Sequence, residues 1–180
     1  PIFDSNVNLD KAPSIKHRLE LLSCVIIEDN AVADAFERLA EKIAASINAA
    51  EGVFRLGLTT GSSPVALYRS LVRRHEAGEI SFRNVEIFSI DEYYPAPEDS
   101  RSRNSRLYEE LVSKVDIKPE NVHVPKLTRT LDGMEVSEFC RKYDQMARGL
   151  DLLIMGMGEK GQVGFNEAGA SELSRTRTVL

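Results

Sequence analysis

Apolar runs alternate with amphipathic segments four times along this chain of 180 residues. The apolar runs are typical of buried strands, and the segments between them repeat apolar residues at the spacing of a helix. Parallel strands are joined by crossover helices, so this alternation predicts an α/β fold. We expect a single domain in three αβα layers, with a doubly wound, mainly parallel, Rossmann-like sheet and helices on both of its faces.

The same pattern places the individual elements. Strands are expected at residues 21–28, 53–58, 85–90, 122–124 and 150–155, and helices at residues 31–50, 64–76, 105–114 and 132–148. Ser63 is expected to cap the second helix, with Pro64 as its first residue. The last helix is expected to turn a stripe inward, namely Val136, Phe139, Cys140, Tyr143, Met146 and Ala147. Residues 1–20 are expected to form an irregular amino-terminal segment.

Charge and composition exclude several classes of partner. The net charge is −5, and no stretch gathers enough lysine and arginine to follow a phosphate backbone, so nucleic acid is not expected. No apolar run approaches the roughly 20 residues that cross a bilayer, and no signal-peptide pattern is present, so we expect a cytoplasmic protein without a membrane partner. The histidines are scattered and the cysteines lie far apart, so neither a metal site nor a cofactor is expected.

The end of the chain has a pattern of its own. Residues 177–180, RTVL, are typical of the start of a strand, and no helix cap or polar tail follows them. We therefore expect the chain to be a fragment of a longer protein, with a sheet that is incomplete at its carboxyl terminus.

The first loop that suits chemistry is the hydroxyl turn, residues 59–63, which follows one expected strand and precedes a helix. Its members are Thr59, Thr60, Gly61, Ser62 and Ser63. Free backbone N–H groups, the positive end of the helix dipole and four hydroxyl groups suit a phosphate oxyanion. The turn lacks the lysine of a P-loop. The structural alternative is a capped turn whose hydroxyl groups face water.

The second loop follows the strand at 85–90 and begins with two carboxylates, Asp91 and Glu92. Adjacent residues at a strand end point to opposite sides, so the two should differ in role. One can face the crevice as a general base; the alternative is a pair of ordinary strand-end carboxylates. Further along, Arg101, Arg103 and Arg106 form a small basic cluster, which we interpret as a solvated loop and helix start.

The third loop is the glycine segment, residues 156–169, which follows the last expected strand. Ligands of open α/β sheets bind at the carboxyl ends of the strands, where this segment lies. Residues 156–161 match the pattern G-x-G-x-x-G, but a dinucleotide site also needs an acidic residue about 20 positions on. Residues 174–180 are instead basic and rich in hydroxyl groups. A glycine-rich turn without function is the other alternative.

In order and spacing, the three loops resemble the glucosamine-6-phosphate deaminase/isomerase family and the related 6-phosphogluconolactonases. The matching pieces are LGLTTGSSP at 56–64, FSIDEYYP at 88–95, DLLIMGMGEKGQVGFNEAGA at 151–170 and SRTRT at 174–178. The resemblance implies an enzyme that opens the ring of glucosamine 6-phosphate and moves a proton between C2 and C1. Release of ammonia then leaves fructose 6-phosphate.

The resemblance also implies roles for single residues. Asp91 is implied as the base that shuttles the proton, and the hydroxyl turn, Gly158 and Lys160 as the site that binds the phosphorylated sugar. Glu167 is implied as the carboxylate that orients a ring-opening histidine. These roles agree with physical expectation, because a bound phosphate is a remote anchor that fixes the reacting end of the substrate.

Two residues depart from the pattern. Where the family usually has Asp-Gly-His, this chain has Lys160-Gly161-Gln162. Gln162, at the position of the catalytic histidine, cannot carry a proton at neutral pH. Lys160 places a cation where the partner carboxylate is implied. General acid–base catalysis contributes about 10²–10⁴-fold, so weak activity on a closed ring is expected.

Three functions are therefore open. The first is a deaminase/isomerase that acts on a phosphorylated amino sugar. The second is a 6-phosphogluconolactonase, because Asp91, the hydroxyl turn and the glycine segment suit that reaction as well. The third is a catalytically silent module that binds a sugar phosphate, which the residues at 160 and 162 motivate. A homo-oligomer is compatible with each.

Overall fold

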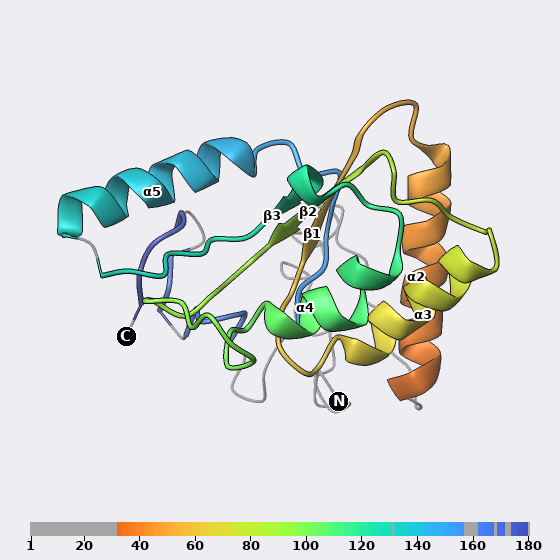
Figure 1. Ribbon diagram of the computed structural model, residues 1–180, viewed down its shortest axis with the longest axis horizontal. Coiled ribbons are helices and arrows are strands. Elements are labelled where there is room, and N and C mark those ends of the chain that lie inside the picture. Colours follow the sequence, from red (N-terminus) through yellow and green to blue (C-terminus); the bar gives the residue numbers. More distant parts are fainter. Residues whose placement is uncertain (1–31, 131, 157–161, 168, 172–173, 180) are drawn as a thin grey trace, which may run out of the picture.

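The computed structural model of the protein describes residues 32–130, 132–156, 162–167, 169–171 and 174–179. Helices and strands alternate through this part of the chain (Figure 1). The helices are α2 (Val32–Ala49), α3 (Val65–Glu76), α4 (Ser105–Glu110) and α5 (Gly133–Met146), with short 3₁₀ helices at Val112–Lys114 and Pro119–Asn121. The strands are β1 (Phe54–Leu58), β2 (Val85–Ser89), β3 (Val122–His123) and β4 (Leu152–Leu153).

The four strands form one sheet in the order β3-β2-β1-β4, and every neighbouring pair is parallel. Strand β1 therefore lies between β2 and β4, although β4 is far away in sequence. Parallel neighbours bring their carboxyl ends to the same edge of the sheet. The predicted α/β class with a parallel sheet is confirmed.

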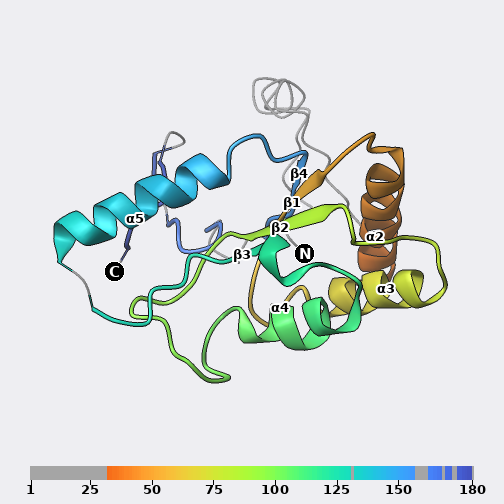
Figure 2. The same ribbon diagram turned by 45° about the horizontal axis from the view of Figure 1, so that its top comes forward.

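Strand β1 has two covered faces. Phe54, Leu56 and Leu58 point to one face and join the buried core with apolar residues of α2, α3 and α4. Arg55 points to the other face, where its guanidinium donates to backbone carbonyl groups at and just beyond the carboxyl end of α5. Accordingly, α5 lies on the opposite side of the strands from α2 and α3 in both ribbon views (Figures 1 and 2).

A buried phenol also joins α5 to the sheet. The buried Tyr143 hydroxyl donates to the backbone oxygen of Ser89, 2.7 Å away, and lies 3.1 Å from that of His123. Burial of the ring raises the pKa of Tyr143 well above its usual value, so the hydroxyl stays protonated. The N-cap residue of α5 is Asp132, whose side chain forms a reciprocal capping box with Glu135.

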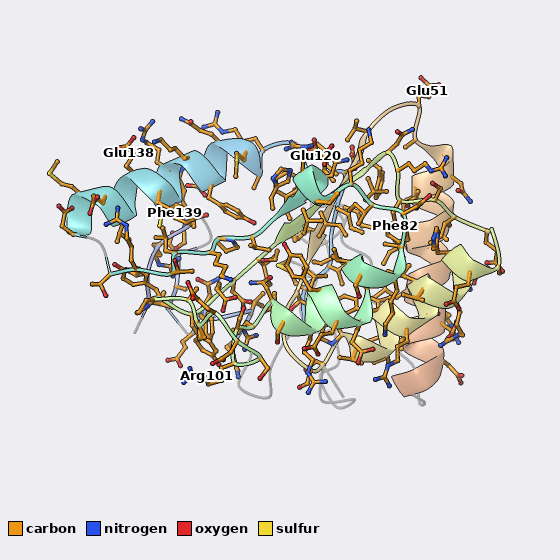
Figure 3. All side chains as sticks on the ribbon, viewed as in Figure 1. Glu51, Phe82, Arg101, Glu120, Glu138 and Phe139 are labelled. Carbon is orange, nitrogen blue, oxygen red and sulfur yellow. The ribbon has the colours of Figure 1, made fainter. Side chains whose placement is uncertain are left out.

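The rest of the stripe predicted for α5 is less buried than expected. Among its expected inward residues, only Tyr143 is fully buried, while Met146 is exposed. Figure 3 shows that Phe139 lies on the side of α5 that faces the strands, whereas Glu138 projects away. Val136 and Cys140 of the stripe instead line an open cavity of about 290 Å³, together with residues 175–178.

Several predicted element ends were wrong. Helix α3 starts at Val65, with Pro64 in the cap position and no side-chain cap, so Ser63 does not cap it. The helix predicted over 105–114 ends at Glu110, and the next turn is a 3₁₀ helix. Residues 174–179 form no strand. The expected strand at 21–28 lies outside the described residues, as does the segment 1–20.

Strand β4 is much shorter than the apolar run 150–155 that predicted it. Its backbone pairs with β1 only from Asp151 N, which donates to Arg55 O, to Ile154 N, which donates to Gly57 O. A Cβ at Gly57 would lie 2.5 Å from Leu153 Cδ1, so glycine at this position leaves room for the Leu153 side chain. None of the described helices is both long and apolar enough to cross a membrane.

Candidate active site

Three loops meet at the carboxylate of Asp91, which follows β2 and is 8% exposed. The Thr60 hydroxyl, from the hydroxyl turn after β1, donates to Asp91 Oδ1. Gly164, from the glycine segment after β4, has a φ of +59°, and a Cβ there would lie 3.5 Å from Asp91 Oδ2. Within the described residues, this Oδ2 is buried and has no hydrogen-bond partner. The loops at the carboxyl ends of three parallel strands thus enclose one carboxylate, whose Oδ2 accepts no hydrogen bond from the described residues.

Arg103 completes this cluster, and the sequence interpretation missed it. Its Nε lies 3.2 Å from Asp91 Oδ1 and 3.1 Å from Thr60 Oγ1. The guanidinium carbon lies 4.8 Å from the centre of the Phe165 ring and 5.9 Å from that of Tyr93. The side chain of Arg103 is only 25% exposed, so its interpretation as a solvated loop residue was wrong.

The other two arginines of the basic cluster behave as expected. Arg101 is 79% exposed and pairs with Asp99 in its own loop, and Arg106 is exposed on α4. In Figure 3, Arg101 lies at the outer edge of the molecule.

Burial lowers the pKa of Arg103, but the attraction of Asp91 and hydrogen bonds with Tyr93 and Asp91 outweigh burial and raise it above its usual value. Arg103 therefore stays charged.

Glu92 holds the turn that presents Arg103. Its carboxylate accepts hydrogen bonds from the Ser102 hydroxyl, from Arg103 N at 2.9 Å and from Asn104 Nδ2 at 2.8 Å. Burial raises the pKa of Glu92, but these bonds and one from Tyr93 N lower it further than burial raises it. The two adjacent carboxylates therefore have different surroundings: Asp91 contacts the hydroxyl turn and Arg103, and Glu92 shapes the loop beside it.

Replacing Glu92 with glutamine should lower the free energy of unfolding by about 1–2 kcal/mol at pH 7, because charge-assisted hydrogen bonds become neutral ones. The folded-state pKa of Glu92 is below its unfolded value. The stabilisation is therefore complete above the unfolded pKa and is lost as the pH falls through the folded pKa. Urea denaturation should show the difference between the two proteins narrowing below about pH 4.

The matched control for this substitution is Glu98→Gln, at an exposed glutamate of the same loop. It should change the free energy of unfolding by less than about 0.5 kcal/mol. A difference between Glu92→Gln and the unchanged protein that persists at low pH would contradict the role assigned to the Glu92 carboxylate.

The hydroxyl turn divides its side chains between two directions. Thr60 points to Asp91, as described above, whereas Ser62 and Ser63 are exposed at the start of α3. Gly61 has a φ of +88°, which favours glycine, and its N–H donates to Arg103 O at 3.3 Å. Thr59 is half-buried, and its carbonyl oxygen accepts from the hydroxyl of Tyr68. The turn thus carries two exposed hydroxyl groups at a helix start.

The structure describes only part of the glycine segment. Gly158 and Lys160 lie outside the described residues, and Gln162 is half-buried. Residues 163 and 166 form an antiparallel bridge that turns the chain toward Asp91. Glu167 is exposed, and no hydrogen bond or ion pair between described residues joins it to Asp91. The roles implied for Gly158, Lys160, Gln162 and Glu167 stay predictions.

Comparison with known sequences agrees with this arrangement. A family model described as glucosamine-6-phosphate isomerases/6-phosphogluconolactonase matches residues 28–164. The chain is 39% identical to a glucosamine-6-phosphate isomerase of Candida albicans over 152 residues, which are 81% of this chain and 59% of that protein. It is 40% identical to a glucosamine-6-phosphate deaminase of Parabacteroides distasonis over 143 residues, 77% of this chain and 52% of that protein. The chain thus spans little more than half the length of these relatives.

Comparison with solved structures also finds proteins named as glucosamine-6-phosphate deaminase and 6-phosphogluconolactonase. A monomeric glucosamine-6-phosphate deaminase is similar with a TM-score of 0.74 and 29% identity, over 83% of this chain and 61% of that one. A 6-phosphogluconolactonase of Thermotoga maritima is similar with a TM-score of 0.61 and 23% identity, over 78% of this chain and 62% of that one. The second likeness concerns the fold alone.

Proposed function

This chain belongs to the family of glucosamine-6-phosphate isomerases and 6-phosphogluconolactonases, and from that premise we propose that it is a deaminase/isomerase acting on glucosamine 6-phosphate. The relatives named as deaminases or isomerases share about two fifths of their matched residues with it, whereas the lactonase likeness is structural. A phosphorylated sugar is retained inside cells, which supports a cytoplasmic location. Self-association of the chain stays an expectation.

The observation that carries the proposal is the position of Asp91. A carboxylate beside the hydroxyl turn, with one buried oxygen that has no partner among the described residues, can take a proton from a bound sugar. In the open-chain substrate, Asp91 takes the C2 proton and returns it to C1. The aldehyde oxygen gains a proton and the amine nitrogen loses one through solvent, so a C1 hydroxyl and a C2 imine form. Water adds to C2, ammonia leaves, and fructose 6-phosphate remains.

Gln162 favours a second candidate function. Without a proton-carrying side chain at this position, the closed ring must open spontaneously or with help from another group. The chain can therefore bind the sugar phosphate and convert it slowly or not at all. If the rate of conversion is zero, the chain is a silent module that only binds the sugar phosphate.

Ammonia release and binding together test the proposal. The purified chain should release ammonia from glucosamine 6-phosphate, slowly, and none from glucosamine, which lacks the phosphate anchor. Calorimetric binding of the phosphorylated sugar without ammonia release would favour the silent module. Hydrolysis of 6-phosphogluconolactone without any ammonia release would favour the lactonase, and no binding of any phosphorylated sugar at millimolar concentration would refute all three.

A further inference from the structure

Arg103 lies between the candidate base and the hydroxyl turn. Its backbone carbonyl accepts from Gly61 N, and its Nε contacts Asp91 and Thr60. We propose that Arg103 is the cationic ligand that binds the phosphate group of the substrate at the hydroxyl turn. This inference rests on the proposed function, because it takes the substrate to be a phosphorylated sugar.

The hydroxyl turn needs such a cation to hold a phosphate. Its hydroxyl groups and the start of α3 supply hydrogen-bond donors and a partial positive charge, whereas a phosphate dianion is held more firmly by a full positive charge. The guanidinium of Arg103 is close enough to supply it. Its Nη2 and Nη1 lie 3.4 Å and 3.8 Å from the point that a Cβ on Gly61 would occupy. The charge thus lies beside Gly61 of the turn.

Neighbouring groups also restrict the position of the Arg103 guanidinium. Phe165 and Tyr93 lie within stacking distance of it, and both rings are partly exposed, at 36% and 46%. The two ring centres lie 5.8 Å from each other, so both rings contact the guanidinium from the same side. The five N–H donors of an arginine all lie in the plane of its guanidinium. The Glu92 carboxylate fixes the backbone of Arg103 and therefore the base of this side chain.

One arginine can hold both charged groups at once. The contacts with Asp91 and Thr60 use Nε, and the terminal amino groups extend past them toward Gly61. A phosphate bound by these amino groups would be separated from Asp91 by the positive charge, which reduces repulsion between two anions. Arg103 would then set the distance between the phosphate end and the reacting end of the sugar.

The test measures binding of fructose 6-phosphate, the proposed product, which cannot be converted back to the amino sugar without ammonia. Isothermal titration calorimetry compares it with fructose and with inorganic phosphate, for the unchanged chain and for Arg103→Gln. The variant should bind fructose 6-phosphate and phosphate about 10–100-fold more weakly, because hydrogen bonds between charged groups are lost. Its affinity for fructose should change less than about twofold. Arg103→Lys should recover only part of the lost affinity, because an ammonium cannot form the two parallel hydrogen bonds that a guanidinium forms with a phosphate.

Arg101→Gln is the matched control, since Arg101 lies on the same loop but is exposed and pairs with Asp99. It should leave the affinity for fructose 6-phosphate unchanged. In the unchanged chain, the side-chain Nε–H signal of Arg103 should shift in NMR spectra as phosphate is added, which tests the contact without any substitution at position 103.

The outcomes separate this inference from the proposed function. If the unchanged chain prefers fructose 6-phosphate to fructose, and Arg103→Gln has the same preference, the assignment of Arg103 is wrong while the proposed function stands. If the unchanged chain shows no preference, the proposed function fails, and this inference fails with it. If Arg103→Gln does not fold, the NMR titration of the unchanged chain decides. An Arg103 Nε–H signal that does not shift when phosphate is added overturns the assignment.

Discussion

Asparagine at position 91 should lower the rate of proton transfer on the substrate by at least about 10²-fold, the smallest contribution usual for a positioned base. The substitution keeps the shape of the side chain and an oxygen that can accept from Thr60, but it removes the proton acceptor. Solvent exchange isolates this step, because incubation of fructose 6-phosphate in D₂O should exchange a C1 proton for deuterium. NMR spectroscopy follows the exchange without any need for ammonia.

The affinity of Asp91→Asn for fructose 6-phosphate should change little, since the substitution leaves the hydroxyl turn intact. Asp99→Asn is the matched control, because Asp99 is an exposed aspartate that pairs with Arg101. That control should exchange deuterium at the rate of the unchanged chain. A folded Asp91→Asn protein that exchanges as fast as the unchanged chain would show that another group is the base.

The double substitution Gln162→His with Lys160→Asp should raise ammonia release from glucosamine 6-phosphate by about 10²–10⁴-fold, the range of general acid–base catalysis. Histidine changes its charge near neutral pH and can move a proton to and from the ring oxygen, which glutamine cannot do. An aspartate at 160 supplies the carboxylate that holds such a histidine in one tautomer. The measurement is the initial rate of ammonia release by both proteins at saturating substrate.

Gln162→Asn with Lys160→Asp is the control for this gain, because it changes the same positions without adding a group that titrates near neutral pH. It should release ammonia no faster than the unchanged chain. A histidine variant that binds fructose 6-phosphate normally and still shows no gain would mean that ring opening does not limit the reaction. Deuterium exchange, which follows the later proton transfer, should be less affected by the double substitution than ammonia release.

The sequence indicated the fold well where a pattern depends on local spacing. The predicted ranges of α2, β1 and β2 differ from the observed ones by at most one or two residues, because their apolar residues follow one period from end to end. Strand β4 was predicted too long because an apolar run does not show where pairing stops. Met155 belongs to the run but is exposed beyond the last bond to β1.

The site was predictable as far as topology determines it. Parallel strands that are neighbours in the sheet end at the same edge, so the proximity of Asp91, Thr60 and the glycine segment follows from the order of the strands. Arg103 was missed because it reaches the site from an irregular loop, where no period predicts direction. The available signal was indirect: a turn suited to phosphate without a lysine, and a second carboxylate at position 92 able to organise a loop.

The pairing of β1 with both neighbours affects the order in which the site can be built. Leu56 pairs with Ile87 on β2, a short way along the chain, but with Leu152 on β4 only after a further long stretch has been made. Closing a longer loop costs more entropy, and contacts distant in sequence form later. During synthesis, Asp91 can therefore meet Thr60 well before the ribosome has released the segment that contains Gly164. Until then, the side of Asp91 that Gly164 later covers stays open to water.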